Sequence, residues 1–139
     1  MPKKYELTDE TIEYKGRKLY RIRALRYFSD VKKGDLGGFI EHEGNLSHKG
    51  ECWINHNAKV YDNARILDDA QVYGNAQVFE ASRIFGNAWV FDDAKIHGKA
   101  WVYDGADVCG KALIYGDTVL YSGVKISGDT KIYNNKLVY

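Results

Sequence analysis

Aliphatic residues recur at every sixth position through most of this chain. The series begins at Ile54 and runs to Val138, so that fifteen successive positions carry valine, isoleucine or leucine. Two residues before each of these positions stands, in most cases, a small residue such as alanine, and only Lys136 clearly breaks that rule. A fixed internal period of this kind indicates a stack of repeated structural units.

Each six-residue unit predicts one short strand followed by a bend. The small and the aliphatic residue are two positions apart, so their side chains point to the same face of a strand. The residues that end each unit are rich in glycine, asparagine and aspartate, which tolerate positive φ and favour a sharp corner. A helix needs apolar residues three and four positions apart, and the repeat does not have that spacing.

Three units make one coil of 18 residues, and coils stack at the distance between neighbouring strands, about 4.8 Å. We therefore expect an all-β fold, a three-sided parallel β-helix with valine and isoleucine inside and alanine at the corners. Each buried aliphatic side chain stabilises such a fold by roughly 1.5–3 kcal/mol. The register continues upstream through Ile40 and Leu46, with two extra residues before Cys52, which places the solenoid at 38–139.

The pattern aliphatic-x-x-x-small-x resembles the hexapeptide repeat of left-handed parallel β-helices, and the left-handed sense of the coils is implied by this resemblance alone. Together with the junction DVKKGDLGGFIEHEGNLSHKGECWI at 30–54, the repeat is similar to an uncharacterised group of hexapeptide-repeat proteins from bacterial, phage and prophage genomes. That resemblance implies the fold but no established activity. It suggests a phage or prophage setting, with interference in host defence as one purpose.

Residues 1–37 lack the repeat, and we expect them to form a β-hairpin that caps the first coil. The stretch TIEYKGRKLYRIRAL alternates through Tyr20 and Ile22, with a turn near Lys15-Gly16. An uncovered first coil would expose a strand edge, and capping is therefore the default role of this segment.

The charge of the chain is close to balanced, with a formal net charge of +1, which argues against nucleic acid as a partner. Residues 1–36 are the basic part, with ten Lys and Arg against six Asp and Glu. Arg17, Arg21 and Arg23 alternate onto one side of the expected hairpin and are a weak candidate for a polyanion site. A solvated strand face is the interpretation that we favour.

Two cysteines, Cys52 and Cys109, are expected to be reduced thiols, because they form no disulfide framework. The chain has no signal-like stretch and no run of about 18 apolar residues. We therefore expect a soluble protein in the cytoplasm of a bacterial host cell, with no membrane contact and no cofactor.

Aromatic residues stand beside most of the aliphatic positions and sort into columns, because neighbours on one face are 18 residues apart. Rings stacked in this way stabilise a sheet by a few tenths to about 1 kcal/mol per pair. The columns are Tyr61, Phe79, His97, Tyr115 and Tyr133 on the first face, Leu67, Phe85, Tyr103, Tyr121 and Tyr139 on the second, and Asn55, Tyr73, Phe91, Cys109 and Ser127 on the third.

The second face is the expected interface between copies of the chain, since an exposed apolar patch usually marks a partner. Left-handed β-helix proteins typically pack such faces in trimers, so we expect a homo-oligomer, with a trimer favoured and an end-to-end dimer through the last coil as a second mode. The expected interface residues are Trp101, Tyr103, Val119, Tyr121, Leu137 and Tyr139.

Arg65 and Arg83 stack one coil apart on the second face, beside Phe85, Trp101 and Tyr103. Two guanidinium groups about 4.8 Å apart repel each other unless an anion lies between them. A phosphate, a nucleotide or a partner's carboxylates would serve, and the rings could stack on a base. We favour the alternative, which is ion pairing with the corner residues Asp62, Asp68 or Asp69.

His97 is the one histidine that points outward within a face. In the acyltransferases that this repeat resembles, a histidine at a subunit boundary acts as general base on the acceptor. No inserted loop interrupts the repeat to build an acceptor pocket, so His97 is only a weak catalytic candidate. His42, His48 and His56 lack the tight spacing of a zinc site, and we expect no metal.

Taken together, these features favour a non-catalytic binding or scaffold protein that assembles through its aromatic faces. It would hold a host protein or a nucleotide-like small molecule at a subunit boundary. An acyl-CoA-dependent acyltransferase that uses His97 and a purely structural element are the two alternatives.

Overall fold

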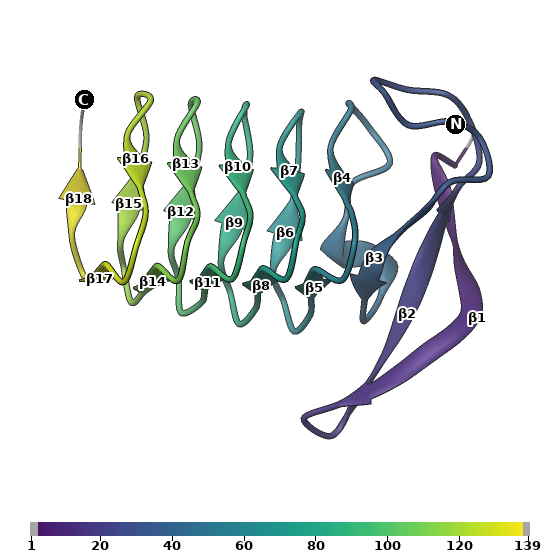
Figure 1. Ribbon diagram of the computed structural model, residues 1–139, viewed down its shortest axis with the longest axis horizontal. Coiled ribbons are helices and arrows are strands. Elements are labelled where there is room, and N and C mark those ends of the chain that lie inside the picture. Colours follow the sequence, from purple (N-terminus) through teal and green to yellow (C-terminus); the bar gives the residue numbers. More distant parts are fainter. Residues whose placement is uncertain (1–2, 138–139) are drawn as a thin grey trace.

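The computed structural model describes residues 3–137, and within this range the protein is built from strands and turns (Figure 1). A long hairpin opens the chain, and a single 3-10 turn at Glu43–Asn45 precedes the regular coils. No helix among residues 3–137 has the length and apolar character needed to span a membrane.

The strands after β3 are only two or three residues long and recur with the period of the sequence repeat. In chain order the strands are β1 (Tyr5–Tyr14), β2 (Arg17–Ala24), β3 (Leu36–Ile40), β4 (Trp53–Ile54), β5 (Lys59–Val60), β6 (Arg65–Ile66), β7 (Gln71–Val72), β8 (Gln77–Val78), β9 (Arg83–Ile84), β10 (Trp89–Val90), β11 (Lys95–Ile96), β12 (Trp101–Val102), β13 (Asp107–Val108), β14 (Leu113–Tyr115), β15 (Val119–Leu120), β16 (Lys125–Ile126), β17 (Lys131–Tyr133) and β18 (Lys136–Leu137).

Three sheets form the sides of the solenoid, which confirms the predicted three-sided parallel β-helix. The hairpin sheet has the order β1-β2-β3-β5-β8-β11-β14-β17, the β4 sheet has β4-β7-β10-β13-β16, and the β6 sheet has β6-β9-β12-β15-β18. The short strands pair in parallel one coil apart, so that Val72 pairs with Val90 and Val90 with Val108. From β4 to β17 each position therefore faces the residue 18 places further on.

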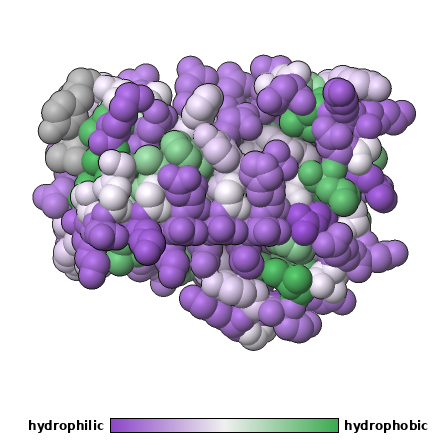
Figure 2. Space-filling view, in the orientation of Figure 1, coloured by the Kyte–Doolittle hydropathy of each residue, from purple (hydrophilic) through white to green (hydrophobic). Residues whose placement is uncertain are grey.

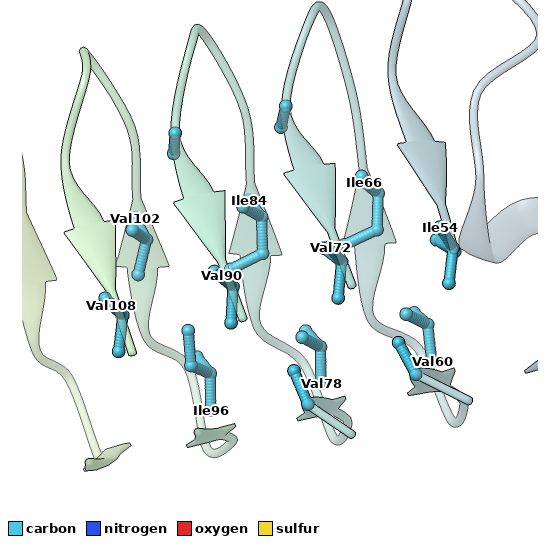
Figure 3. Close-up of a cluster of buried hydrophobic side chains, with 14 of the residues drawn as sticks. Ile54, Val60, Ile66, Val72, Val78, Ile84, Val90, Ile96, Val102 and Val108 are labelled. Atoms are coloured by element: carbon cyan, nitrogen blue, oxygen red, sulfur yellow. The ribbon is translucent and has the colours of Figure 1, made fainter. Parts of the chain in front are cut away.

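The every-sixth aliphatic residues fill the space between the three sheets (Figure 3). From Ile54 to Ile132 none of them is more than 8% exposed, and most are fully buried. The alanines two positions earlier are buried as well, because their side chains point to the same inner face of the strands. The side of the molecule seen in Figure 2 is mostly hydrophilic, with hydrophobic side chains in small separate patches.

The corners explain why acidic residues are frequent in the repeat. Asp62, Asp68 and Asp92 have φ of 57°, 57° and 58°, a left-handed conformation that aspartate tolerates better than most residues. From there each carboxylate accepts the backbone N–H of the corner one coil later, as Asp92 Oδ2 does from Gly110 at 3.0 Å. Corner carboxylates are thus hydrogen-bond acceptors that join neighbouring coils.

The last strand departs from the spacing of the sequence. Lys136 pairs with Val119 and Leu137 pairs with Leu120, so the final connection is one residue shorter than the others. An unbroken period would place Lys136 in the buried small-residue position, where its ammonium group would lose hydration without a partner. The slip leaves Lys136 exposed and gives Leu137 the register that the sequence assigned to Val138, which lies outside the described residues.

The N-terminal hairpin extends the solenoid as part of the same sheet. Its turn is at Lys15-Gly16 as predicted, with φ of 50° and 80°. The predicted boundary between residues 37 and 38 falls inside β3, which pairs antiparallel with β2 and parallel with β5. Figure 1 shows the hairpin leaning away from the coil axis and returning at its turn towards the first coils.

Contacts at both ends of the hairpin hold it to the coils. On the outer face of the hairpin sheet, Leu19, Phe39 and Tyr61 form a small apolar cluster in which Tyr61 is 1% exposed. At the other end Lys4 is fully buried, and its ammonium group donates to the Cys52 carbonyl oxygen at 2.6 Å. Burial is the main cause that lowers the pKa of Lys4.

A pair of glycine substitutions tests the stacking of the corners. Gly110 and Gly128 both have φ of 65°, but a methyl group on Gly110 would lie 2.6 Å from the backbone nitrogen of Gly128, whereas one on Gly128 would meet nothing within 4 Å. Both Gly→Ala changes place a side chain on a residue in the left-handed conformation, which costs about 1 kcal/mol of stability. We expect urea unfolding to show an additional loss of about 1 kcal/mol or more for Gly110→Ala only. Equal losses would contradict the close approach of the coils.

Candidate functional site

The outer surface of the β6 sheet brings together the residues that the sequence proposed for ligand binding. This surface, called the β6 face below, carries two rows of outward side chains on β6, β9, β12 and β15. Arg65 pairs in register with Arg83, and Arg83 with Trp101. The rows are Arg65, Arg83, Trp101 and Val119 before the aliphatic positions, and Leu67, Phe85, Tyr103 and Tyr121 after them.

Neither arginine of this pair forms an ion pair within residues 3–137. The corner pairing favoured by the sequence does not form in the described part of the chain, where these carboxylates have the following partners. Asp62 binds Arg17 at 2.6 Å, and Asp68 accepts the Gly86 N–H at 2.9 Å. Asp69 accepts the N–H of Glu51 at 3.1 Å. Two exposed cationic groups thus remain side by side without a neutralising carboxylate in the described part of the chain.

A hollow of about 220 Å³ opens beside the two arginines. The 3-10 turn at Glu43–Asn45 borders it, and His42 is fixed there because its Nε2 contacts the Asp62 carbonyl oxygen at 2.8 Å and its Nδ1 accepts the Gly44 N–H at 3.1 Å. The lining residues are His42, Gly44, Asn63, Arg65, Ala81 and Arg83. With two guanidinium groups and no acidic side chain in its lining among residues 3–137, this hollow is suited to an anion.

Aromatic rings continue the surface away from the arginines. The Arg83 guanidinium lies 5.9 Å from the centre of the Trp101 ring, within the range of a cation–π contact. Phe85 meets Trp101 edge-on at 5.8 Å and stacks on Tyr103 at 4.6 Å with an interplanar angle of 5°. All five predicted ligand residues therefore lie on one continuous surface.

The residues predicted to form an interface between copies lie beside these rings. Trp101 is 43% exposed, and Tyr103, Val119 and Tyr121 are half-buried beside it. Tyr103 and Tyr121 stack at 5.3 Å, which continues the column of rings. Leu137 pairs in register with Leu120, one residue earlier than the unbroken period predicts, and Tyr139 lies outside the described residues.

The arginines of β2 are used in packing. Arg17 binds Asp62 and lies 4.9 Å from the Tyr61 ring centre, and Arg23 binds Glu6 at 2.7 Å. Arg21 binds Glu10 at 3.0 Å and also donates to the carbonyl oxygens of Gly37 and His56. Because each of the three already has a carboxylate partner, this strand does not offer the free positive row that a polyanion would need.

His97 is held inside a column of rings. It stacks between Phe79 at 4.7 Å and Tyr115 at 5.2 Å, both nearly parallel to it. Its Nδ1 lies 2.8 Å from Glu80 Oε1, and the same oxygen accepts the Gly98 N–H at 2.8 Å. These contacts give His97 a structural role in joining coils, and His97 lines neither the hollow beside the arginines nor the groove described next.

One concave feature of the described surface was not predicted. A groove of about 810 Å³ lies between the loop at 25–36 and the outer face of the β4 sheet, and Figure 1 shows this loop arching beside β4. Tyr73 was the one lining residue noted as an outward ring. The groove forms because a loop outside the repeat packs beside the β4 sheet. The six-residue period says nothing about the position of that loop, so it could not predict the groove. Its lining is Ser29, Asp30, Val31, Asp35, Leu36, Glu51, Trp53, Asn55, His56, Asp69, Gln71, Tyr73 and Trp89.

The Glu80 contacts predict an acid-dependent loss of stability. The hydrogen bond from His97, and then that from the Gly98 N–H, lower the pKa of the Glu80 carboxyl from its ordinary value of 4.5. A carboxyl whose pKa is lower in the folded state stabilises the fold above its unfolded pKa and loses this contribution as the pH falls through the folded value. We therefore expect Glu80→Gln to reduce the loss of unfolding free energy between about pH 7 and pH 3 in urea titrations.

The matched control is Glu13→Gln, because the Glu13 carboxylate is exposed and makes no hydrogen bond within residues 3–137. This control is expected to keep the acid sensitivity of the unchanged protein. Identical pH profiles for Glu80→Gln and the unchanged protein would show that the corner contact contributes nothing to acid stability.

Comparison of the chain with protein-family models and with curated proteins finds no match. The conclusion about function therefore rests on the chemistry of the two surfaces just described.

Proposed function

We propose that this chain is a non-catalytic binding protein whose β6 face holds an anionic, ring-containing ligand of the nucleotide type. One observation carries the proposal: Arg65 and Arg83 stand in register beside a hollow, without a carboxylate partner among residues 3–137, and Trp101 and Phe85 follow directly. A phosphate between the two guanidinium groups would relieve their repulsion. The rings beyond them offer a flat apolar surface on which a base can stack.

The rigidity of the surface supports this role. Each arginine begins a strand that is paired on at least one side, and the hollow is bordered by a turn with its own capping hydrogen bonds. A ligand would therefore meet backbone that is already ordered, which lowers the entropy lost on binding. Sequestration of such a ligand needs only affinity, and it suits the phage-like resemblance of the sequence.

Self-assembly is a second part of the proposal, favoured by the exposure of Trp101. An apolar patch on the β6 face is formed by Trp101, Tyr103, Val119 and Tyr121, and burying a tryptophan at an interface contributes strongly to association. Trp101 belongs both to this patch and to the ligand surface. A trimer formed through the β6 faces would place the bound ligand at the boundary between subunits.

The acyltransferase alternative has less support. His97 has its ring faces covered by Phe79 and Tyr115, and its Nδ1 is bound to Glu80, so only Nε2 is left to remove a proton. His97 lines neither of the two concave surfaces in which an acceptor could bind. A purely structural role would leave the two neighbouring arginines without a function. Binding accounts for both observations.

Ligand retention tests the main proposal. The protein is purified from cells and denatured, and mass spectrometry identifies what it releases; adenosine 5′-monophosphate, adenosine and inorganic phosphate are then titrated by calorimetry. We expect the monophosphate to bind at least tenfold more tightly than adenosine, because the arginines contact the phosphate. Arg65→Gln together with Arg83→Gln is expected to remove this difference.

The charge-matched control is Lys111→Gln with Lys131→Gln, two exposed lysines that make no ion pair or side-chain hydrogen bond within the described range. It is expected to leave the affinity for the monophosphate within twofold. Equal affinities for monophosphate and adenosine, or unchanged binding by the double arginine variant, would contradict the site.

Light scattering on a sizing column tests the assembly. The unchanged protein is expected to be a trimer, and Trp101→Gln is expected to shift it towards a monomer that is still folded by circular dichroism, because the Trp101 side chain lies outside the core. The control is Trp89→Gln, a similarly exposed tryptophan on the β4 sheet, which should keep the trimer. A monomeric unchanged protein would refute the proposed interface.

A further inference from the structure

We propose that the groove between the loop at 25–36 and the β4 sheet binds an extended peptide segment of a partner protein through a lysine or arginine side chain. This site lies on another side of the solenoid from the β6 face, and it does not depend on the function proposed there. Three independent features carry it: the charge of the groove, its aromatic floor and one unused hydrogen-bond donor.

The groove is preformed, because its loop wall is tied down. Phe28 and Val31 exchange backbone hydrogen bonds of 3.1 and 2.8 Å, and Ala24 donates its N–H to the Asp35 carbonyl oxygen at 2.8 Å. The Phe28 ring meets Trp53 edge-on at 5.2 Å, which fixes the loop against the first coil. At about 810 Å³ the groove falls within the range of known ligand sites, about 300–1,000 Å³.

The charge of the groove is strongly one-sided. Asp30, Asp35, Glu51 and Asp69 line it, and no lysine or arginine among residues 3–137 does. None of the four forms an ion pair within that range. Three of them accept one backbone N–H each, from Lys32, Ser29 and Glu51, through a single carboxylate oxygen. The second oxygen of each stays available to a cation, and Asp30 keeps both.

The floor of the groove suits the apolar stem of a long cationic side chain. Trp89 is 47% exposed and Leu36 is 51% exposed, although both lie next to buried strands. Tyr73 meets Trp89 edge-on at 6.3 Å and stacks on Phe91 at 5.0 Å, so the rings are held in place. Lysine and arginine lay their methylene groups along such surfaces, and their charged ends are attracted to ring faces.

Trp53 supplies the donor that points to a peptide rather than to a simple cation. It is 2% exposed and lines the groove, yet its indole N–H has no hydrogen-bond partner within residues 3–137. No fully buried side-chain nitrogen in that range lacks a partner, so this N–H is still accessible, and the groove is the space that Trp53 borders. An accessible N–H at the edge of a groove can donate to a ligand, and a backbone carbonyl beside a cationic side chain provides the acceptor.

Calorimetry with blocked peptides tests this site. The probe is acetyl-Gly-Leu-Lys-Leu-Gly-amide, its control is the same peptide with norleucine in place of lysine, and spermidine is the free-amine probe. We expect the lysine peptide to bind at least tenfold more tightly than the norleucine peptide. In ¹⁵N spectra of the full chain, binding should shift the Trp53 and Trp89 indole N–H signals and leave that of Trp101 in place.

The matched variants are Asp30→Asn with Asp69→Asn in the groove, and Asp93→Asn with Asp129→Asn at exposed corners that do not line it. An asparagine at 69 keeps an oxygen for the Glu51 N–H, so folding is preserved, and thermal unfolding checks this. The double variant in the groove should lower the affinity for the lysine peptide at least tenfold. The double variant at the corners should lower it less than twofold. Equal binding of lysine and norleucine peptides, binding of spermidine alone, or an unshifted Trp53 signal would overturn the proposal.

Discussion

The hydrogen bonds between coils are the constraint on which this structure depends. The N–H of Gln77 donates to the Ala94 carbonyl oxygen and that of Phe79 to Ile96, and the same step is repeated from coil to coil. A backbone paired in this way leaves no polar group unsatisfied in the interior. It also fixes which residues become neighbours, because whatever stands 18 places further along must stack on its predecessor. The core, the corner carboxylates and the outward columns all follow from that step.

The two candidate sites arise where non-repetitive segments meet this regular frame. On the β6 face the columns place Arg65 beside Arg83, and the turn at Glu43–Asn45 turns that flat surface into a hollow. On the β4 sheet the loop at 25–36 forms one wall of the groove, and Tyr73 and Trp89 lie in its floor. One surface is cationic and the other anionic, although the chain as a whole is almost neutral. The solenoid supplies rigid, flat walls, and the irregular segments supply shape and selectivity.

Period and local chemistry made most of the fold and part of the site predictable. Spacing alone placed Val72, Val90 and Val108 in the core and Phe85, Trp101 and Tyr103 on one surface, since columns need no knowledge of long-range packing. Spacing could not show that Asp62 forms its ion pair with Arg17 rather than with Arg65, because that pairing depends on how the hairpin packs against the coils. The groove was also missed, because it depends on the packing of the loop at 25–36, which lies outside the repeat. The one-residue slip at Lys136 was signalled by a lysine in a buried position, but the unbroken run of aliphatic residues concealed it.

Parallel stacking has a consequence for how any ligand must be shaped. Groups in one column are separated along the axis by whole numbers of strand spacings, about 4.8 Å each. A binding partner therefore gains most affinity when its own charges and rings repeat at the same interval. Inserting or removing one complete coil would move the outward groups beyond it by a single strand spacing along the axis, and it would leave the spacing within each remaining part unchanged. Length and affinity can thus change in discrete steps, without redesign of the interior.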